Sequence, residues 1–293
     1  MSRCATELAL PLRNITLAAK AWGDRTLPPL LALHGWLDNA ASFDGIAPLL
    51  ESHYVVAVDL AGHGRSDWRI AAMWDYWLDN LDDLNQLFQH FGWASADLLG
   101  HSLGGTLAST YAAAFPERVR RLILIEALGP LSLSIDQTLP QLRKGLAARA
   151  SFNAPTLRVF PEVEHAARAR MLANGLSRAA ATSLVERGLI EVHGESSRGY
   201  RWSSDPRLLM PSLQRYSEEQ AVAILDEINA PTLLIVADPA HPYARGSAMQ
   251  TRIDHVANLQ VQRLAGNHHL HLESPQPVAQ AINEFLAFHA NQS

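Results

Sequence analysis

Residues 96–115 read ADLLGHSLGGTLASTYAAAF, and they contain a Gly-x-Ser-x-Gly pattern, GHSLG, at 100–104. The apolar residues before the pattern are typical of a buried strand, and an apolar helical stretch follows it. A serine at the tip of a sharp strand-to-helix turn needs glycines two places before and after it, because a Cβ there would clash with neighbouring backbone. Ser102 is alternatively a simple N-cap, but this context favours a nucleophile placed beside helix N–H groups.

Short apolar runs alternate with helical patterns on both sides of this turn. We expect buried strands at 28–35, 54–62, 96–102, 120–127, 231–238 and 258–266, and helices at 43–50, 75–91, 103–115 and 275–289. This alternation predicts the α/β fold class, with a mostly parallel central sheet, helices on both of its faces and right-handed crossovers.

The middle of the chain lacks strand-like runs of this kind. Stretches rich in Ala, Leu and Arg predict helices at 140–150, 161–174 and 178–187, and the polar–aromatic piece at 199–202 is compatible with a strand. A helical insertion between two strands of one sheet is typical of a cap. We therefore predict a core made of residues 1–128 and 229–293 and an inserted helical cap, or lid, at 129–228.

Composition excludes several classes of protein. The chain has 293 residues, of which 48% are hydrophobic and 18% charged, so a sizeable core can form and wholesale disorder is excluded. A net charge of −5 argues against a nucleic-acid partner, and the single cysteine, Cys4, excludes an intramolecular disulfide and a cysteine-rich metal site. No apolar run approaches the ~18–20 residues that span a bilayer, and the N-terminus lacks a signal-peptide pattern. We expect a cytoplasmic protein without membrane insertion.

Four motifs lie at the ends of expected strands: HGW at 34–36, DLAGHGRS at 59–66, GHSLGG at 100–105 and GNHHLHLE at 266–273. With them the chain resembles the α/β-hydrolase fold superfamily along nearly its whole length, and its capped serine hydrolase-like branch in particular. The resemblance implies a Ser-His-acid triad and an oxyanion hole. In that fold, the triad residues occur along the chain in the order Ser, acid, His. We expect no cofactor and no metal.

The resemblance also implies which residues form the oxyanion hole and which is the general base. The oxyanion hole would consist of the backbone N–H of Leu103 and that of Trp36 in the His-Gly-x loop, although Trp36 is alternatively a core aromatic. The general base would be His268, the first of three crowded histidines. We expect His269 to point elsewhere and His271 to make a structural hydrogen bond. A metal site here is disfavoured, because no helical i, i+4 pairing of ligands accompanies the cluster.

The acid departs from the usual pattern of the family, because its common position after the cap holds Ala240. Two candidates remain. Glu126 ends the strand before the cap, where some relatives such as haloalkane dehalogenases carry the acid, and Asp238 lies two residues before the usual position. The acid must reach Nδ1 of the base, fix its tautomer and stabilise the imidazolium. We favour Glu126 and keep Asp238 as the alternative.

Such a triad suits hydrolysis of an ester, thioester or amide through an acyl-enzyme. Relatives that attack carbon by alkyl transfer carry Asp where Ser102 stands, so those activities are disfavoured. Apolar residues in the cap favour small to medium hydrophobic carboxylic esters as substrates. The alternatives are a carbon–carbon bond hydrolase or a perhydrolase with the same triad, and a ligand-binding module with little turnover, which Ala240 favours. The sequence does not indicate an oligomeric state.

Overall fold

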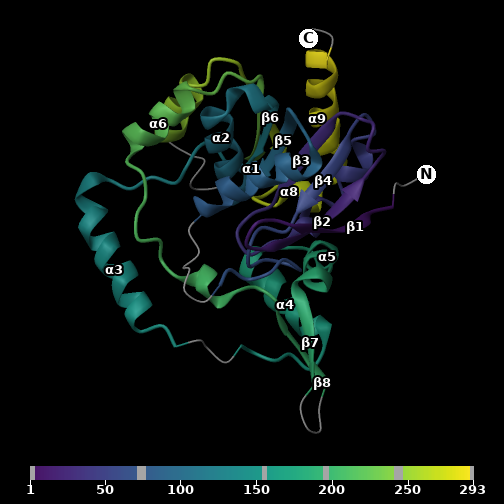
Figure 1. The fold of residues 1–293 in the computed structure, drawn as a ribbon, viewed down its shortest axis with the longest axis vertical. Coiled ribbons are helices and arrows are strands. Elements are labelled where there is room, and N and C mark those ends of the chain that lie inside the picture. Colours follow the sequence, from purple (N-terminus) through teal and green to yellow (C-terminus); the bar gives the residue numbers. More distant parts are fainter. Residues whose placement is uncertain (1–3, 71–76, 154–156, 194–197, 241–246, 291–293) are drawn as a thin grey trace.

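The computed structural model describes residues 4–70, 77–153, 157–193, 198–240 and 247–290. An eight-stranded sheet forms the centre of the molecule, in the order β1-β2-β4-β3-β5-β6-β9-β10 (Figure 1). Its strands are β1 (Thr6–Pro11), β2 (Thr16–Trp22), β3 (Pro29–Leu33), β4 (Tyr54–Val58), β5 (Ala96–His101), β6 (Val119–Ile125), β9 (Thr232–Asp238) and β10 (Leu259–Ala265). β1 and β2 pair antiparallel at one edge, and all pairings from β4 to β10 are parallel, which confirms the mostly parallel sheet.

Helices cover both faces of this sheet, as expected. One apolar layer joins the sheet to α1 (Asp79–Phe91), α2 (Leu103–Ala114), α6 (Glu218–Asp226) and α7 (Ser247–Asp254). The opposite layer contains η1 (Ala40–Phe43), η2 (Ala47–Leu49), α8 (Leu270–Glu273) and α9 (Pro275–Ala290). Alternate strand residues supply the two layers: Leu31 and Leu33 pack in the first, Leu30 and Ala32 in the second.

Two expected helices need correction, and two strands were missed. The helix expected at 43–50 is instead the two 3₁₀ turns η1 and η2, since Pro48 cannot continue an α-helical hydrogen-bond ladder. The helix expected at 75–91 begins at Asp79, and residues 75–76 lie outside the described residues. β1 and β2 were not expected: they form a half-exposed antiparallel edge whose apolar residues alternate with polar ones and alanine.

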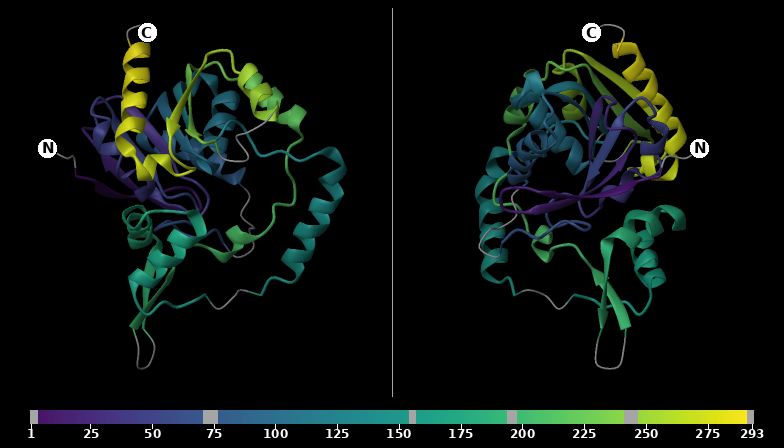
Figure 2. Two further views of the ribbon diagram at one scale, coloured as in Figure 1. Left: turned by 180° about the vertical axis from the view of Figure 1, so that it is seen from behind. Right: turned by 45° about the vertical axis from the view of Figure 1, so that its right-hand side comes forward.

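The insertion between β6 and β9 lies between two paired strands of the sheet. It contains α3 (Thr138–Ala150), α4 (Val163–Asn174), α5 (Arg178–Gly188) and a hairpin of β7 (Leu189–His193) and β8 (Arg198–Trp202), with short turns η4 (Ile135–Gln137) and η5 (Pro206–Leu209); η3 (Pro116–Arg118) precedes β6. The group α4, α5, β7 and β8 lies together below the sheet, while α3 stands apart on a long connection (Figures 1 and 2).

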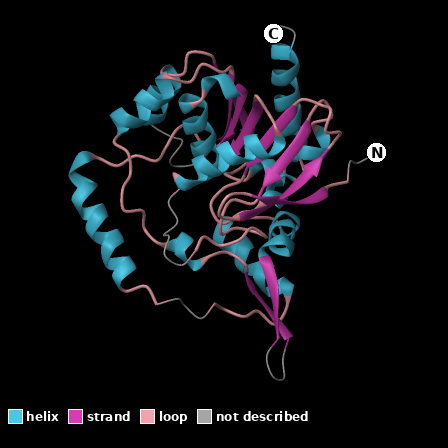
Figure 3. Ribbon diagram, in the orientation of Figure 1, coloured by secondary structure: helices cyan, strands magenta, loops and turns pink. Residues whose placement is uncertain are grey.

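The predicted cap range, 129–228, includes α6, yet Leu225 of this helix packs in the core layer that also contains α2. The domain boundaries themselves stay a prediction. Helices and loops make up most of the insertion, and its only strands among the described residues are the β7–β8 pair (Figure 3). None of the helices that the structure describes is both long enough and apolar enough to cross a membrane.

Candidate active site

Ser102 stands at a strained turn between β5 and α2. Its backbone has φ +50° and ψ −114°, in a region that residues with a side chain rarely adopt. Both neighbouring glycines are required by space: a Cβ on Gly100 would lie 2.4 Å from the carbonyl oxygen of Gly104, and a Cβ on Gly104 would lie 1.9 Å from that of Leu33. The structure therefore has the sharp strand-to-helix turn that the Gly-x-Ser-x-Gly pattern predicts.

The loop after β3 packs directly against this turn. The amide of Gly104 donates to the carbonyl of His34 at 3.0 Å, and the amide of Ser102 donates to Ile125 at 3.1 Å. Leu103, whose N–H is a candidate for the oxyanion hole, lies between these two anchored amides at the start of α2. Because Trp36 follows His34 by two residues, the structure brings the two predicted oxyanion segments together.

Trp36 is not a core aromatic. Its side chain is 52% exposed, and its Nε1 donates to the carbonyl of Leu208 in the cap at 3.0 Å. The indole ring therefore lies at the boundary between core and cap, and the other predicted role, a backbone N–H facing the substrate, stays open to it.

Glu126, the residue after β6, faces the predicted base. Its Oε2 lies 3.2 Å from Nδ1 of His268, and its Oε1 accepts a 2.6 Å hydrogen bond from the amide of Ala237 on β9. Glu126 is fully buried and has φ +55°, so its backbone is held in an unfavourable conformation that aims the carboxylate. A carboxylate at Nδ1 favours the ring tautomer that carries its proton on Nδ1 and a lone pair on Nε2.

Asp238, the alternative acid, occupies the last position of β9. It is exposed, and its backbone carbonyl accepts a 3.1 Å hydrogen bond from the amide of Gly266. Of the two carboxylates considered from the sequence, the structure brings Glu126 to His268.

Three further histidines, His101, His269 and His271, form a buried cluster beside the predicted base. Nε2 of His271 lies 2.7 Å from Oγ of Ser42, which is the structural hydrogen bond that was expected, and burial lowers the pKa of His271 to about 3. His101, which precedes Ser102, has its Nε2 2.8 Å from the carbonyl oxygen of His268. Among the described residues, no three His, Cys, Asp or Glu side chains are grouped to hold a metal ion.

Two side chains of this region escaped the sequence reasoning. Asp38 is buried beside His101 and His269, and Arg170, on α4 of the cap, forms an ion pair with it. The sequence could have indicated Asp38 as a site residue, because it lies four residues after the start of the HGW motif. No sequence pattern distinguishes Arg170 from the other arginines on the cap helices.

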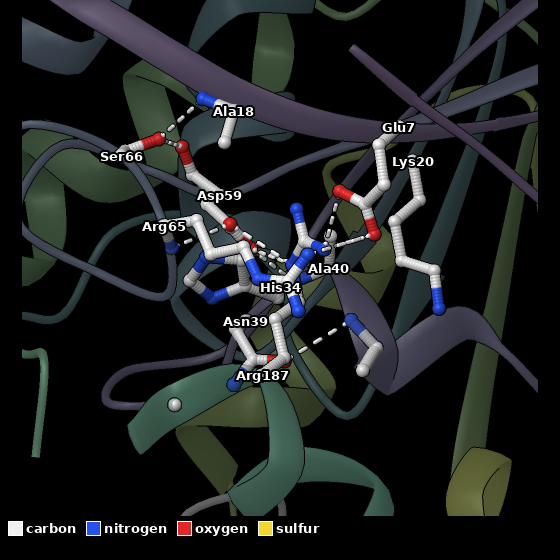
Figure 4. A network of polar contacts seen from close by, with 12 residues as sticks. Glu7, Ala18, Lys20, His34, Asn39, Ala40, Asp59, Arg65, Ser66 and Arg187 are labelled. Atoms are coloured by element: carbon white, nitrogen blue, oxygen red, sulfur yellow. Dashed lines mark hydrogen bonds and ion pairs between the residues drawn. The ribbon is translucent and has the colours of Figure 1, made fainter. Parts of the chain in front are cut away.

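Asp59 ties the cap to the core at a second place (Figure 4). This buried carboxylate accepts hydrogen bonds from the amides of Ala40 at 2.7 Å and Arg65 at 2.8 Å, and from Nε of Arg187 on α5 at 2.9 Å. Arg187 also pairs with Glu7 of β1 at 2.8 Å. The segment at 59–66 thus holds the cap helix α5 against both the sheet edge and the loop after β3.

Comparisons with known proteins identify the family of the chain. The model of the alpha/beta hydrolase fold family matches residues 28–275. A serine hydrolase-like protein of Dictyostelium discoideum is 31% identical over 93% of this chain and 79% of its own length. Serine hydrolase-like protein 2 of Homo sapiens is 31% identical over 96% of this chain and 93% of its own length.

Two solved structures are similar over almost their whole length. A hypothetical protein from Pseudomonas aeruginosa PAO1 has 35% identity and a TM-score of 0.89, covering 96% of this chain and 99% of the other. The thioesterase domain from the curacin biosynthetic pathway has 27% identity and a TM-score of 0.82, covering 95% and 99%. The chain belongs to the alpha/beta hydrolase fold family and is a hydrolase of its serine hydrolase-like branch.

Proposed function

We propose that this hydrolase cleaves small to medium hydrophobic carboxylic esters, with Ser102 as nucleophile, His268 as general base and Glu126 as the acid of the triad. The observation that carries the proposal is the 3.2 Å contact between His268 and the buried Glu126, together with the strained turn at Ser102, whose preceding residue His101 contacts the carbonyl oxygen of His268. Together they supply an oriented base and a nucleophile held at the tip of a turn.

The reaction would proceed in two similar steps. Oγ of Ser102 loses its proton to Nε2 of His268 and attacks the ester carbonyl, and the backbone N–H groups of Leu103 and Trp36 stabilise the resulting oxyanion. The imidazolium of His268, stabilised by Glu126, then donates its proton to the departing alcohol. Water attacks the acyl-enzyme with the same base, and Ser102 is released with the carboxylic acid product.

Placement of the Glu126 carboxylate supports its role. One oxygen is fixed by the amide of Ala237, so the other is left to orient His268. An acid held in this way needs no reorganisation when the imidazolium forms, which is what a triad acid contributes.

A hydrophobic substrate is supported by the apolar boundary between core and cap. The half-exposed indole of Trp36 is fixed there by its bond to Leu208, and Leu209, the next residue, is 56% exposed. An acyl or alkoxy group bound between the two parts would bury this apolar surface, which favours binding by about 25 cal/mol for each Å² removed from water.

Thioesters are a second candidate class, favoured by the similarity to the thioesterase domain from the curacin biosynthetic pathway. The same nucleophile, base and oxyanion donors serve a thioester carbonyl. Measuring kcat/KM for an aryl ester and an alkyl thioester of the same acid would rank the two classes.

Hydrolysis of p-nitrophenyl esters from acetyl to octanoyl, by the wild type and Ser102→Ala, tests the proposal. We expect turnover that depends on acyl length and falls by at least about 10³-fold in the variant. Equal rates in the two proteins would contradict Ser102 as the nucleophile, and no turnover of any ester or thioester by folded wild type would favour the ligand-binding alternative.

A further inference from the structure

Asp38 is a buried carboxylate at the meeting point of three segments of the site. It is 1% exposed and lies in the loop that also carries Trp36. Its Oδ2 is 3.7 Å from Nδ1 of His101, the residue before the nucleophile, and 3.6 Å from Nε2 of His269, the residue after the base. A charge at this position therefore acts on the oxyanion loop, the nucleophile turn and the base loop together.

His101 does not supply a positive charge to this carboxylate. Nε2 of His101 points at the carbonyl oxygen of His268, so it carries the proton of the neutral ring, and Nδ1 turns a lone pair toward Asp38. Burial and the neighbouring histidines keep the pKa of His101 well below its ordinary value, so its ring is neutral. Consistent with this, Oδ2 of Asp38 and Nδ1 of His101 are both buried without a hydrogen-bond partner among the described residues.

Asp38 nevertheless remains ionised. Burial alone would raise its pKa, but contact with His269 and the charge of Arg170 lower it well below the ordinary range. Within the described ranges, Arg170 is the one arginine or lysine that forms an ion pair with Asp38. The side chain of Arg170 is only 12% exposed and comes from α4 of the cap. The counter-charge of a carboxylate in the core is thus supplied by the inserted segment.

We propose that Arg170 is a positioning residue for the hydrolysis: by neutralising Asp38, it removes a negative charge from beside the oxyanion loop, so that the site is electrostatically complete only while α4 is docked. This inference rests on the proposed function, because it concerns the oxyanion that Trp36 and Leu103 would stabilise. Without Arg170, the unpaired carboxylate would oppose the negative charge that develops on the substrate oxygen.

The two single substitutions that break the pair separate this role from a purely structural one. Arg170→Gln leaves an unpaired anion, whereas Asp38→Asn leaves an unpaired cation, although both lose the same contact. We expect Arg170→Gln to lower kcat about tenfold or more with a smaller change in KM, and Asp38→Asn to change kcat by less than about threefold. The kcat of the double variant should be at least about threefold higher than that of Arg170→Gln, because Asp38→Asn removes the unpaired anion.

Arg187→Gln is the matched control, since it breaks a second buried ion pair between cap and core, with Asp59. It should lower Tm while kcat of the folded protein stays within about threefold of wild type. The kcat of Arg170→Lys, which keeps the positive charge, should also stay within about threefold of wild type. If Arg170→Gln does not fold, Arg170→Lys is the variant that tests the proposal.

Steady-state hydrolysis of one p-nitrophenyl ester by all six proteins, with Tm measured on each, decides the matter. Equal losses of kcat in Arg170→Gln and Asp38→Asn, a double variant no faster than Arg170→Gln, or a tenfold loss in Arg170→Lys would each overturn the positioning role. A wild type without any hydrolysis would instead overturn the proposed function beneath it.

Discussion

Oε2 of Glu126 lies 3.2 Å from Nδ1 of His268, although 142 residues and the whole inserted segment separate the two in the chain. The contact exists because β6 and β9 are parallel neighbours in the sheet and β10 follows β9, so the loops that leave their carboxyl ends meet at one edge. The same edge carries Ser102, at the end of β5.

Replacing the acid should therefore separate the two carboxylates that the sequence offers. Glu126→Gln keeps the shape but cannot stabilise the imidazolium, so we expect kcat to fall by about 10²–10⁴-fold, whereas Asp238→Asn should change kcat by less than about threefold. Aryl ester hydrolysis measures both. The reverse ranking would assign the acid to Asp238.

Gly104 should be intolerant of any side chain. A Cβ there would lie 1.9 Å from the carbonyl oxygen of Leu33, so Gly104→Ala must displace backbone at the nucleophile turn, and we expect it to cost more than about 3 kcal/mol. Gly92→Ala is the control: Gly92 has a positive φ, +66°, and open space around it, whereas Gly104 lies in the first turn of α2, so the control adds backbone strain without a clash and should cost about 1 kcal/mol. Urea unfolding compares them, and a loss in Gly104→Ala no larger than that in Gly92→Ala would contradict the role given to the clash.

Arg187 and Arg65 both pair with Glu7, yet their substitutions should differ. Arg187 is 4% exposed and also pairs with the fully buried Asp59, so Arg187→Gln leaves a buried charge and should cost about 3 kcal/mol of unfolding free energy. Arg65 is 55% exposed, and loss of its side chain should cost less than about 0.5 kcal/mol. Chemical denaturation of both variants checks this, and a large loss in Arg65→Gln would contradict the role given to burial.

Asp97, buried at the start of β5, should make the protein acid-sensitive. Burial alone would raise its pKa, but hydrogen bonds from His53 and Arg121 and the charge of Arg120 lower it from an ordinary value of 3.8 to about 2. At a pH between these two pKa values, Asp97 is protonated in the unfolded chain and ionised in the folded protein. Its contribution to the free energy of unfolding, about 2 kcal/mol, is therefore present above pH 4 and is lost as the pH falls toward 2.

The stability difference between wild type and Asp97→Asn isolates this contribution, because other acidic groups titrate in both proteins. Urea unfolding at several pH values between 2 and 7 should give a difference that is constant above pH 4 and shrinks below it. A difference that does not change with pH would mean that the pKa of Asp97 is not lowered by folding.

Strands buried on both faces were the predictable part of the fold. β3, β4, β5, β6 and β9 appear in the sequence as continuous apolar runs, because helices cover both sides of a parallel sheet. β1 and β2 pair antiparallel at the edge, where one face meets solvent, so Lys20 and several alanines interrupt their pattern. Their pairing is decided by contacts between distant residues, not by local sequence.

The choice of the acid shows a similar limit. Ile125 and Ile235 are partners in register, so Glu126, just after β6, and Asp238, the last residue of β9, lie at the same edge of the sheet. What separates them is local conformation: the positive φ of Glu126 and its bond to the amide of Ala237 turn its carboxylate toward His268. Neither feature has a sequence pattern. The pair of Asp38 and Arg170 was harder still, because it joins residues 132 apart across the boundary between core and cap.

Labelling with a fluorophosphonate tests the central claim most directly, since the reagent reacts with a serine only when its base and oxyanion donors are assembled. Intact mass should show one adduct on the wild type and none on Ser102→Ala. An adduct of equal yield on the variant, or no adduct on wild type that is folded by circular dichroism, would contradict the assignment of Ser102 as an activated nucleophile.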